Sequence, residues 1–123
     1  MTNPLNRELR DALVPGAGLL MPGAANALTA RIIEDCDHRV FLVSGAAIAN
    51  TYLGVPDIGL VSLSELAGHV SSIRDAVNLP MVVDGDTGFG NAINVGHTVR
   101  VLERAGANAI MLEDQTFPKR WAV

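Results

Sequence analysis

The sequence predicts an α/β fold in which a parallel β-sheet is covered by helices. Four short apolar runs alternate with segments that have the apolar spacing of an amphipathic helix. Strands joined by helical crossovers run parallel, and continuous apolar strands are typical of a buried parallel sheet. A repeat of about 30 to 40 residues suits a TIM-type (β/α)8 barrel, in which about 250 residues are normal. Residues 1–123 are therefore expected to form one partial α/β-barrel domain, the N-terminal half of a barrel, truncated after the fourth strand.

The first half of the chain predicts two helices and two strands. A short helix is expected over residues 6–14, where a Pro-Gly pair stops it, and a strand near residues 19–21. Residues 24–35 have the spacing of a helix with one buried stripe, and residues 40–43 form an apolar run typical of a strand. The expected stripe consists of Leu28, Ile32 and Cys36.

The second half of the chain predicts a longer helix, a strand, another helix and a final strand. Ser62 and Glu65 have the spacing of a capping box, which marks a helix start, and a proline ends this helix before a strand at residues 81–83. A helix over residues 91–105 and a strand over residues 109–112 follow. The residues expected to face the sheet are Leu63, Leu66, Ala67, Val70, Ile73 and Val77 in the first helix and Val95, Val99 and Leu102 in the second.

Composition and charge indicate which kinds of partner and which cellular compartment to expect. The net charge of -4 and the pI near 5.2 argue against a nucleic-acid surface, and a small-molecule partner is expected instead. No stretch approaches the roughly 20 apolar residues that a membrane helix needs, so no membrane partner is expected. Cys36 is the only cysteine, which excludes an internal disulfide and fits a reducing compartment; we expect it to be a buried structural thiol. These features predict a soluble cytoplasmic protein.

Acidic residues follow the predicted third and fourth strands. Asp84 and Asp86 are two residues apart, so their side chains can aim at one spot if the extended backbone persists through Gly85. Glu113 follows the neighbouring strand, and oxygen donors at adjacent strand ends suit Mg²⁺ or Mn²⁺. Such an ion can polarise an oxygen and stabilise an enolate. The alternative is a solvated turn in which aspartate and asparagine only cap the next helix.

Other polar residues near the same edge have two interpretations each. The segment 44–46 offers the Ser44 hydroxyl and backbone N–H groups that can bind a carboxylate or phosphonate, or Ser44 can simply cap a helix. Asp57 can be an outer acid of the metal site or an ordinary turn residue after proline. Lys119 and Arg120 are candidate catalytic residues that place positive charge beside an anionic substrate, although paired basic residues are usually solvated.

Five segments, taken in chain order, resemble the isocitrate lyase and phosphoenolpyruvate mutase superfamily. They are PGAANAL at 22–28, SGA at 44–46, GVPD at 54–57, VDGDTGFG at 83–90 and EDQTFPKR at 113–120. The resemblance implies a Mg²⁺-dependent barrel that acts on α-keto or 2-hydroxy acids through a pyruvate enolate. The loops resemble those of methylisocitrate lyase, dimethylmalate lyase and oxaloacetate decarboxylase-like members more than those of the mutase.

The resemblance also implies roles for individual positions. Asp84 matches the direct metal ligand, and Asp57, Asp86 and Glu113 match acids that hold the ion directly or through water. Residues 44–46 match the segment that grips the substrate carboxylate. The full-length family is expected to form homo-oligomers.

The end of the chain departs from the family pattern. Lyases of this family continue after Pro-Lys-Arg with Cys-Gly-His, whose cysteine transfers a proton, whereas this chain reads Trp-Ala-Val at 121–123. We therefore expect little or no lyase activity from the chain as given. The alternatives to a lyase are a non-catalytic remnant or interaction fragment, and a phosphoenolpyruvate mutase-type enzyme of phosphonates.

Overall fold

A four-stranded parallel sheet forms the centre of the chain, as predicted. The computed structural model describes residues 3–119. The sheet has the strand order β1-β2-β3-β4, and each neighbouring pair is parallel. Its strands are β1 (Gly23–Ala24), β2 (Phe41–Val43), β3 (Met81–Asp84) and β4 (Ala109–Met111). Because all four strands run parallel, they end at the same edge, which we call the carboxyl edge of the sheet.

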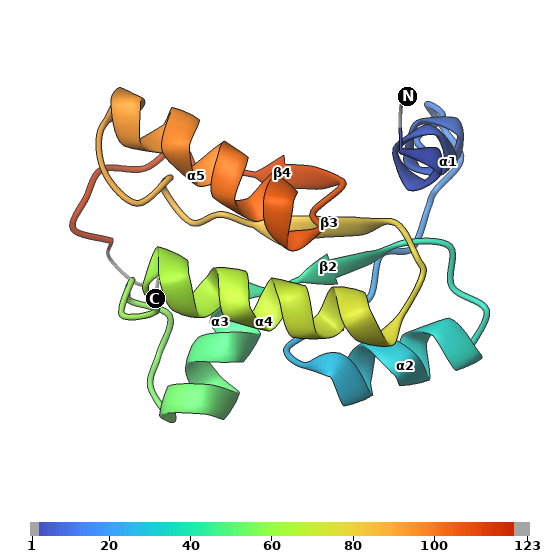
Figure 1. Cartoon of the computed structure of the whole chain (residues 1–123), viewed down its shortest axis with the longest axis horizontal. Helices are drawn as coiled ribbons and strands as arrows, with labels where there is room; N and C mark the ends of the chain where they lie inside the picture. The colour runs from blue at the N-terminus through green and yellow to red at the C-terminus, as the bar shows by residue number, and fades with distance from the viewer. Residues whose placement is uncertain (1–2, 120–123) are drawn as a thin grey trace.

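Three helices form a layer against one face of this sheet. Figure 1 shows α2, α4 and α5 side by side, with α1 apart from them near the amino ends of the strands. The Asn108 side-chain amide, just before β4, donates to Asn6 Oδ1 of α1 over 2.7 Å. The helical segments are α1 (Pro4–Ala12), α2 (Ala27–Asp35), α3 (Gly45–Ile48), the π-helix η1 (Ala49–Leu53), α4 (Leu63–Ala76) and α5 (Ala92–Ala105). None of the helices between residues 3 and 119 has the length and apolarity to cross a bilayer.

The core lies between the sheet and the helix layer. Phe41 pairs with Met81 and Val43 with Val83, and all four side chains are fully buried. Because side chains alternate along a strand, the intervening residues of β2 and β3 point to the opposite face and are only partly buried. The predicted stripe of α4 is confirmed: Leu66, Val70 and Ile73 are buried, and Leu63 packs against the same core.

The helix caps agree with the sequence signals. The Ser62 N–H donates to the Glu65 carboxylate over 2.8 Å, and the Glu65 N–H donates back to Ser62 Oγ over 3.3 Å, which is the predicted capping box. Asn91 and Asn94 form a second capping box that starts α5. Gly106 ends α5 with a φ of 113°, a left-handed conformation that favours glycine.

The first strand lies later in the chain than predicted. We expected it near residues 19–21, but β1 spans Gly23–Ala24. Its ladder to β2 consists of the Leu42 N–H donating to the Pro22 carbonyl over 2.9 Å and the Ser44 N–H donating to the Ala24 carbonyl over 3.1 Å. The apolar run at 19–21 was a misleading signal, because Leu20 within it is exposed rather than buried.

The predicted buried stripe of α2 is wrong. Leu28 and Ile32 are 69% and 53% exposed, and Cys36 is exposed as well, so it is not the buried thiol that we expected. The buried positions are Ala30 and Ile33. Helix α2 packs against α4 and β1. The face that contains Ala30 turns toward them, because a small side chain permits a close approach between the elements.

The inward face of α5 also differs from the prediction. Val99 is 39% exposed, and Thr98 occupies the fully buried position one residue earlier, with Leu102 on the same face as predicted. The Thr98 hydroxyl donates to the Gly88 carbonyl over 2.9 Å. This buried hydrogen bond ties α5 to the glycine-rich loop after β3 and explains why a polar residue is stable there.

Thr98→Val should destabilise the chain through this bond. Valine keeps the shape of threonine but leaves the buried Gly88 carbonyl without its donor, so we expect a loss of about 1–3 kcal/mol in the free energy of unfolding. Thr51→Val is the matched control, because the Thr51 hydroxyl makes an exposed hydrogen bond to the Ala47 carbonyl; its effect should stay within about 0.5 kcal/mol. Urea unfolding of both variants measures the difference, and equal stabilities would contradict the role of Thr98.

Candidate metal and substrate site

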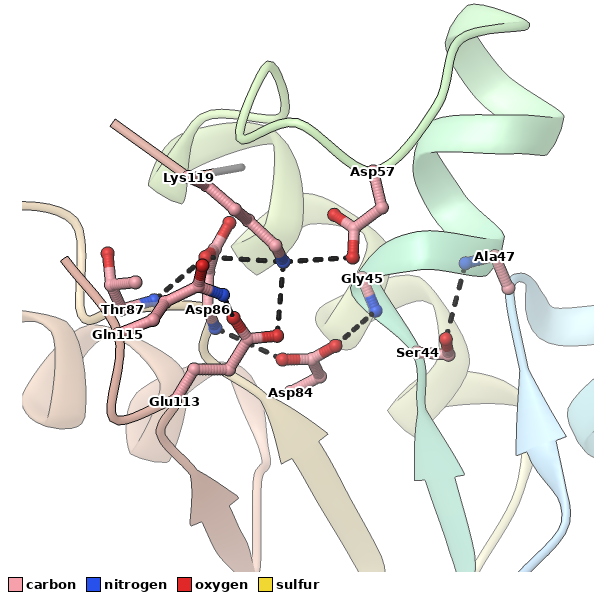
Figure 2. Close-up of polar contacts among 10 residues, drawn as sticks. All are labelled: Ser44, Gly45, Ala47, Asp57, Asp84, Asp86, Thr87, Glu113, Gln115 and Lys119. Atoms are coloured by element: carbon pink, nitrogen blue, oxygen red, sulfur yellow. Dashed lines mark hydrogen bonds and ion pairs between the residues drawn. The ribbon is translucent and has the colours of Figure 1, made fainter. Parts of the chain in front are cut away.

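Charged side chains from three loops meet at the carboxyl edge of the sheet. Asp57 comes from the segment between η1 and α4, Asp84 and Asp86 from the end of β3, and Glu113 and Lys119 from the segment after β4. Figure 2 shows that their charged groups point toward one another. The structure thus brings together all four predicted metal ligands and one of the two predicted basic residues.

Asp84 is the most buried of these acids and links two strand ends. Its side chain is 8% exposed at the end of β3. One carboxylate oxygen accepts from the Gly45 N–H over 3.0 Å, and the other accepts from the Asp86 N–H over 3.1 Å. Asp84 therefore holds the start of α3 and the loop after β3 in fixed positions.

The backbone does not stay extended through Gly85, which was the condition for Asp84 and Asp86 to aim their side chains at one spot from a single strand. Asp86 has a φ of 52°, so the chain turns after β3. Glycine at position 85 permits a close approach to the end of β4, because a Cβ there would lie 2.9 Å from Ile110 and 3.0 Å from Leu112 and would displace their side chains. The Asp86 carboxylate accepts from the Thr87 N–H over 2.9 Å, which orients it within the turn. The turn places both aspartates at the carboxyl edge of the sheet, and the alternation of side chains along β3 does not.

Lys119 lies at the centre of three carboxylates. Its Nζ is 2.8 Å from Asp57 Oδ2, 3.1 Å from Glu113 Oε1 and 3.4 Å from Asp86 Oδ1. The Lys119 side chain is 6% exposed. We call Asp57, Asp86 and Glu113 the carboxylate cage. Their oxygens surround one cation with hard oxygen donors, which is the chemistry that Mg²⁺ and Mn²⁺ favour.

The two most perturbed groups of the site have opposite charges. Burial alone would lower the pKa of Lys119, but hydrogen bonds to Asp57 and Glu113 and the charges of Asp86 and Asp57 outweigh it and raise this pKa above 10.5. Lys119 is therefore a charged ammonium at neutral pH. Burial raises the pKa of Asp84 above 3.8, against the lowering effect of its two backbone N–H donors.

The segment predicted to bind a substrate carboxylate has local roles in this structure. Ser44 Oγ accepts from the Ala47 N–H over 3.2 Å and caps α3, which was the alternative interpretation of this residue. The Gly45 N–H is used by Asp84. Ser44, Gly45 and Ala46 nevertheless lie partly exposed where β2 ends, beside Asp84. Their role in substrate binding stays a prediction.

Part of the predicted site lies beyond the residues that the structure describes. Arg120 and the segment 121–123 lie outside the described residues. Within residues 3–119, no group of three or more acidic, histidine or cysteine side chains could hold a metal ion in its present arrangement. The acids instead share the Lys119 ammonium. The assignment of Asp57, Asp84, Asp86 and Glu113 as metal ligands, and of Lys119 and Arg120 as catalytic residues, stays a prediction.

Sequence reasoning missed the supporting residues and the ion pairs of Lys119. The Gln115 side-chain amide donates to the Glu113 carboxylate, and Thr98 secures the loop that contains Asp86 through Gly88. The only signal for Thr98 was its position at helical spacing from Leu102. Pairing of Lys119 with the cage had no local signal, because Asp57 is 62 residues away in the chain.

Comparisons with known proteins show the family of the chain. A family model described as phosphoenolpyruvate phosphomutase matches residues 9–121. The chain is 47% identical to the 2-methylisocitrate lyase of Aeropyrum pernix, over 95% of this chain and 39% of that protein. It is 38% identical to the 2,3-dimethylmalate lyase of Eubacterium barkeri, over 92% of this chain and 39% of that protein.

Solved structures show the same backbone. Phosphonopyruvate hydrolase in complex with oxalate and Mg²⁺ has a TM-score of 0.88 and 39% identity, over 98% of this chain and 41% of that chain. The solved structure of 2,3-dimethylmalate lyase, a member of the PEP mutase/isocitrate lyase superfamily, has a TM-score of 0.84 and 28% identity, over 97% of this chain and 42% of that chain. The chain thus spans about two fifths of the length of these relatives, and its four strands correspond to half of an eight-stranded TIM-type barrel.

The raised pKa of Asp84 predicts a specific pH dependence. Because the folded chain keeps the Asp84 proton to a higher pH than the unfolded chain does, protonation of Asp84 favours the folded state. This contribution to the free energy of unfolding is full below pH 3.8 and is lost as the pH rises through the pKa of Asp84 in the folded chain. The unfolding free energy of the wild type minus that of Asp84→Asn should therefore fall as the pH rises from below 3.8 through the raised pKa of Asp84 in the folded chain. Denaturant unfolding across this range measures the difference, and a rising difference would contradict the burial argument.

Proposed function

Because this chain belongs to the phosphoenolpyruvate phosphomutase family, we propose that it carries the metal-binding half of a Mg²⁺-dependent carbon–carbon lyase. The substrate class is a 2-hydroxy or α-keto carboxylic acid, cleaved through a pyruvate enolate. The observation that carries the proposal is the convergence of Asp57, Asp86 and Glu113 on one cation beside the buried Asp84. Relatives named as lyases of small carboxylic acids support the reaction class.

The residues present fit Mg²⁺, or Mn²⁺ as an alternative. All four acids offer oxygen donors, and the cage already surrounds a positive group, the Lys119 ammonium. We assign Asp84 as the direct ligand, with the three acids of the cage holding the ion directly or through water. When bound, the ion would polarise a substrate oxygen and stabilise the charge of an enolate.

The chain's own residues would orient the substrate beside this site. Asp84 fixes the Gly45 N–H, and with it the direction of the segment 44–46 that we assign to the substrate carboxylate. Lys119 and Arg120 are assigned as the basic residues that balance the charge of an anionic substrate. Small carboxylic acids are the partners that this chemistry suits, and we propose a cytoplasmic location and a homo-oligomeric full-length form, with no nucleic-acid or membrane partner.

A phosphonate enzyme is the second candidate. The chain is 39% identical to the solved phosphonopyruvate hydrolase but 28% identical to the solved 2,3-dimethylmalate lyase. The 47% identity to a 2-methylisocitrate lyase favours the lyase assignment. Parallel assays with phosphonopyruvate and with methylisocitrate would distinguish the two reaction classes.

The metal site is tested by titration with Mn²⁺ and with oxalate, a planar dianion that resembles a pyruvate enolate. We expect the wild type to bind Mn²⁺, and oxalate only when Mn²⁺ is present, while Asp84→Asn loses at least about tenfold in Mn²⁺ affinity. Asp75→Asn is the matched control, because Asp75 is exposed near the C-terminal end of α4 and should leave the affinity unchanged. Equal affinities of Asp84→Asn and wild type would contradict the assignment of Asp84.

The 123-residue chain by itself should show no measurable turnover of methylisocitrate, dimethylmalate or oxaloacetate with Mg²⁺. A (β/α)8 barrel draws its catalytic groups from the ends of several strands, and four strands supply only part of them. Loss of a positioned general acid alone typically costs about 10²–10⁴ in rate. The assay needs a correction for decarboxylation by the metal alone, and turnover of about 1 per second or more would contradict this expectation.

A further inference from the structure

We propose that Lys119 and the divalent cation compete for one position in the carboxylate cage, so that the cation binds only after the Lys119 ammonium has left. The inference rests on the proposed function, which supplies the cation. It assigns to Lys119 a role other than contact with substrate: Lys119 is the internal counter-ion of the cage when no metal is bound.

The geometry makes the two occupants mutually exclusive. Lys119 Nζ lies within 3.4 Å of an oxygen of each cage member. A Mg²⁺ ion needs oxygen ligands at about 2.0–2.1 Å in an octahedral arrangement, so an ion held directly by the cage oxygens would occupy the space that the ammonium fills. Two positive centres in that space would also repel each other strongly, because Lys119 is almost fully shielded from water.

The charge balance explains why each occupant is stable. Three carboxylates and one ammonium leave a local charge of two negative units, with Asp84 beside them. A divalent cation would neutralise the cage more completely. Lys119, however, is tethered six residues after Glu113, so it cannot diffuse away and competes at a high effective concentration. The measured affinity for the cation should therefore be lower than the oxygen donors alone would give.

Lys119 is also the anchor of the segment after β4. Residues 114–118 are exposed, and Lys119 is the first partly buried residue after Glu113. The segment passes close over Gly59, where a Cβ would lie 3.7 Å from Lys119 Cβ and 3.9 Å from the Phe117 ring. When the ammonium leaves the cage, this segment loses its ion pairs to Asp57 and Asp86. Metal binding should therefore expose the Lys119 amine.

The sequence allows a direct test, because Lys119 is its only lysine. The wild-type chain is treated with an amine-acetylating reagent, and acetylation of Lys119 is followed by mass spectrometry with EDTA and with saturating Mg²⁺ or Mn²⁺ at matched ionic strength. We expect slow acetylation with EDTA and a rate at least about tenfold higher with metal, within the 5–150-fold range typical of coupled sites. An unchanged rate at a concentration where metal is bound would overturn the proposal.

Variants provide the reciprocal measurement. Lys119→Met keeps the length of the side chain without its charge, and it should bind Mn²⁺ about 5–150-fold more tightly than the wild type. Lys119→Arg keeps the positive charge and should give no such gain. Arg104→Met is the matched control for loss of one positive charge, because Arg104 is exposed on α5; it should leave the affinity unchanged.

The outcomes separate the two proposals. If the wild type and Lys119→Met bind Mn²⁺ equally well, competition fails while the metal site stands. Tighter binding by Lys119→Met with an unchanged acetylation rate in the wild type also overturns competition, because the ammonium would then stay in place beside the ion. If neither protein binds Mn²⁺, the proposed function fails as well. Should Lys119→Met not fold, the acetylation of the wild type decides alone.

Discussion

The carboxyl edge of the sheet must accommodate four acidic side chains, three of them around one ammonium group, and mutual repulsion opposes this. The structure meets the constraint with one ammonium group: Lys119 pairs with Asp57, Asp86 and Glu113 at once. Asp84, which is more buried, relies on backbone N–H donors instead. Because partly buried charges are stable only when they are paired or hydrogen-bonded, the loops after β2, β3 and β4 adopt positions that bring these partners together.

The parallel sheet determines which residues can meet at this edge. Parallel strands in sequential order end on the same side, so the segments that follow β2, β3 and β4 are neighbours although they are far apart in the chain. Gly85 lets β3 and the end of β4 approach closely, and Thr98 fixes the glycine-rich loop from the side of the helix layer. The site thus depends on packing that lies outside it, which is typical of sites that need exact placement of several side chains.

The family match and the charge arrangement concern the same part of the chain. The family match covers residues 9–121, and four of the five resembling segments contribute residues to the edge where the acids converge, among them Ser44, Asp57, Asp84 and Glu113. In the described residues, the face of the sheet opposite the helices keeps Leu42 and Val82 only partly buried. In a (β/α)8 barrel such side chains fill the interior in layers, so the same strands that place the acids also supply part of a barrel core.

The sequence by itself determined the alternation of the four strands with α1, α2, α4 and α5, the parallel sheet, the capped start of α4, and the set of acids at the strand ends, but it did not indicate α3 or η1. These features follow from local signals: apolar period, capping residues and the residues that follow each apolar run. Tertiary structure decided what local signals leave open. Helix rotation in α2 and α5 depends on how closely each helix packs, so Ala30 and Thr98 face inward while Leu28 and Val99 do not. The partner of Lys119 depends on long-range topology, because Asp57 and Lys119 are 62 residues apart in the chain and only the folded arrangement brings them together.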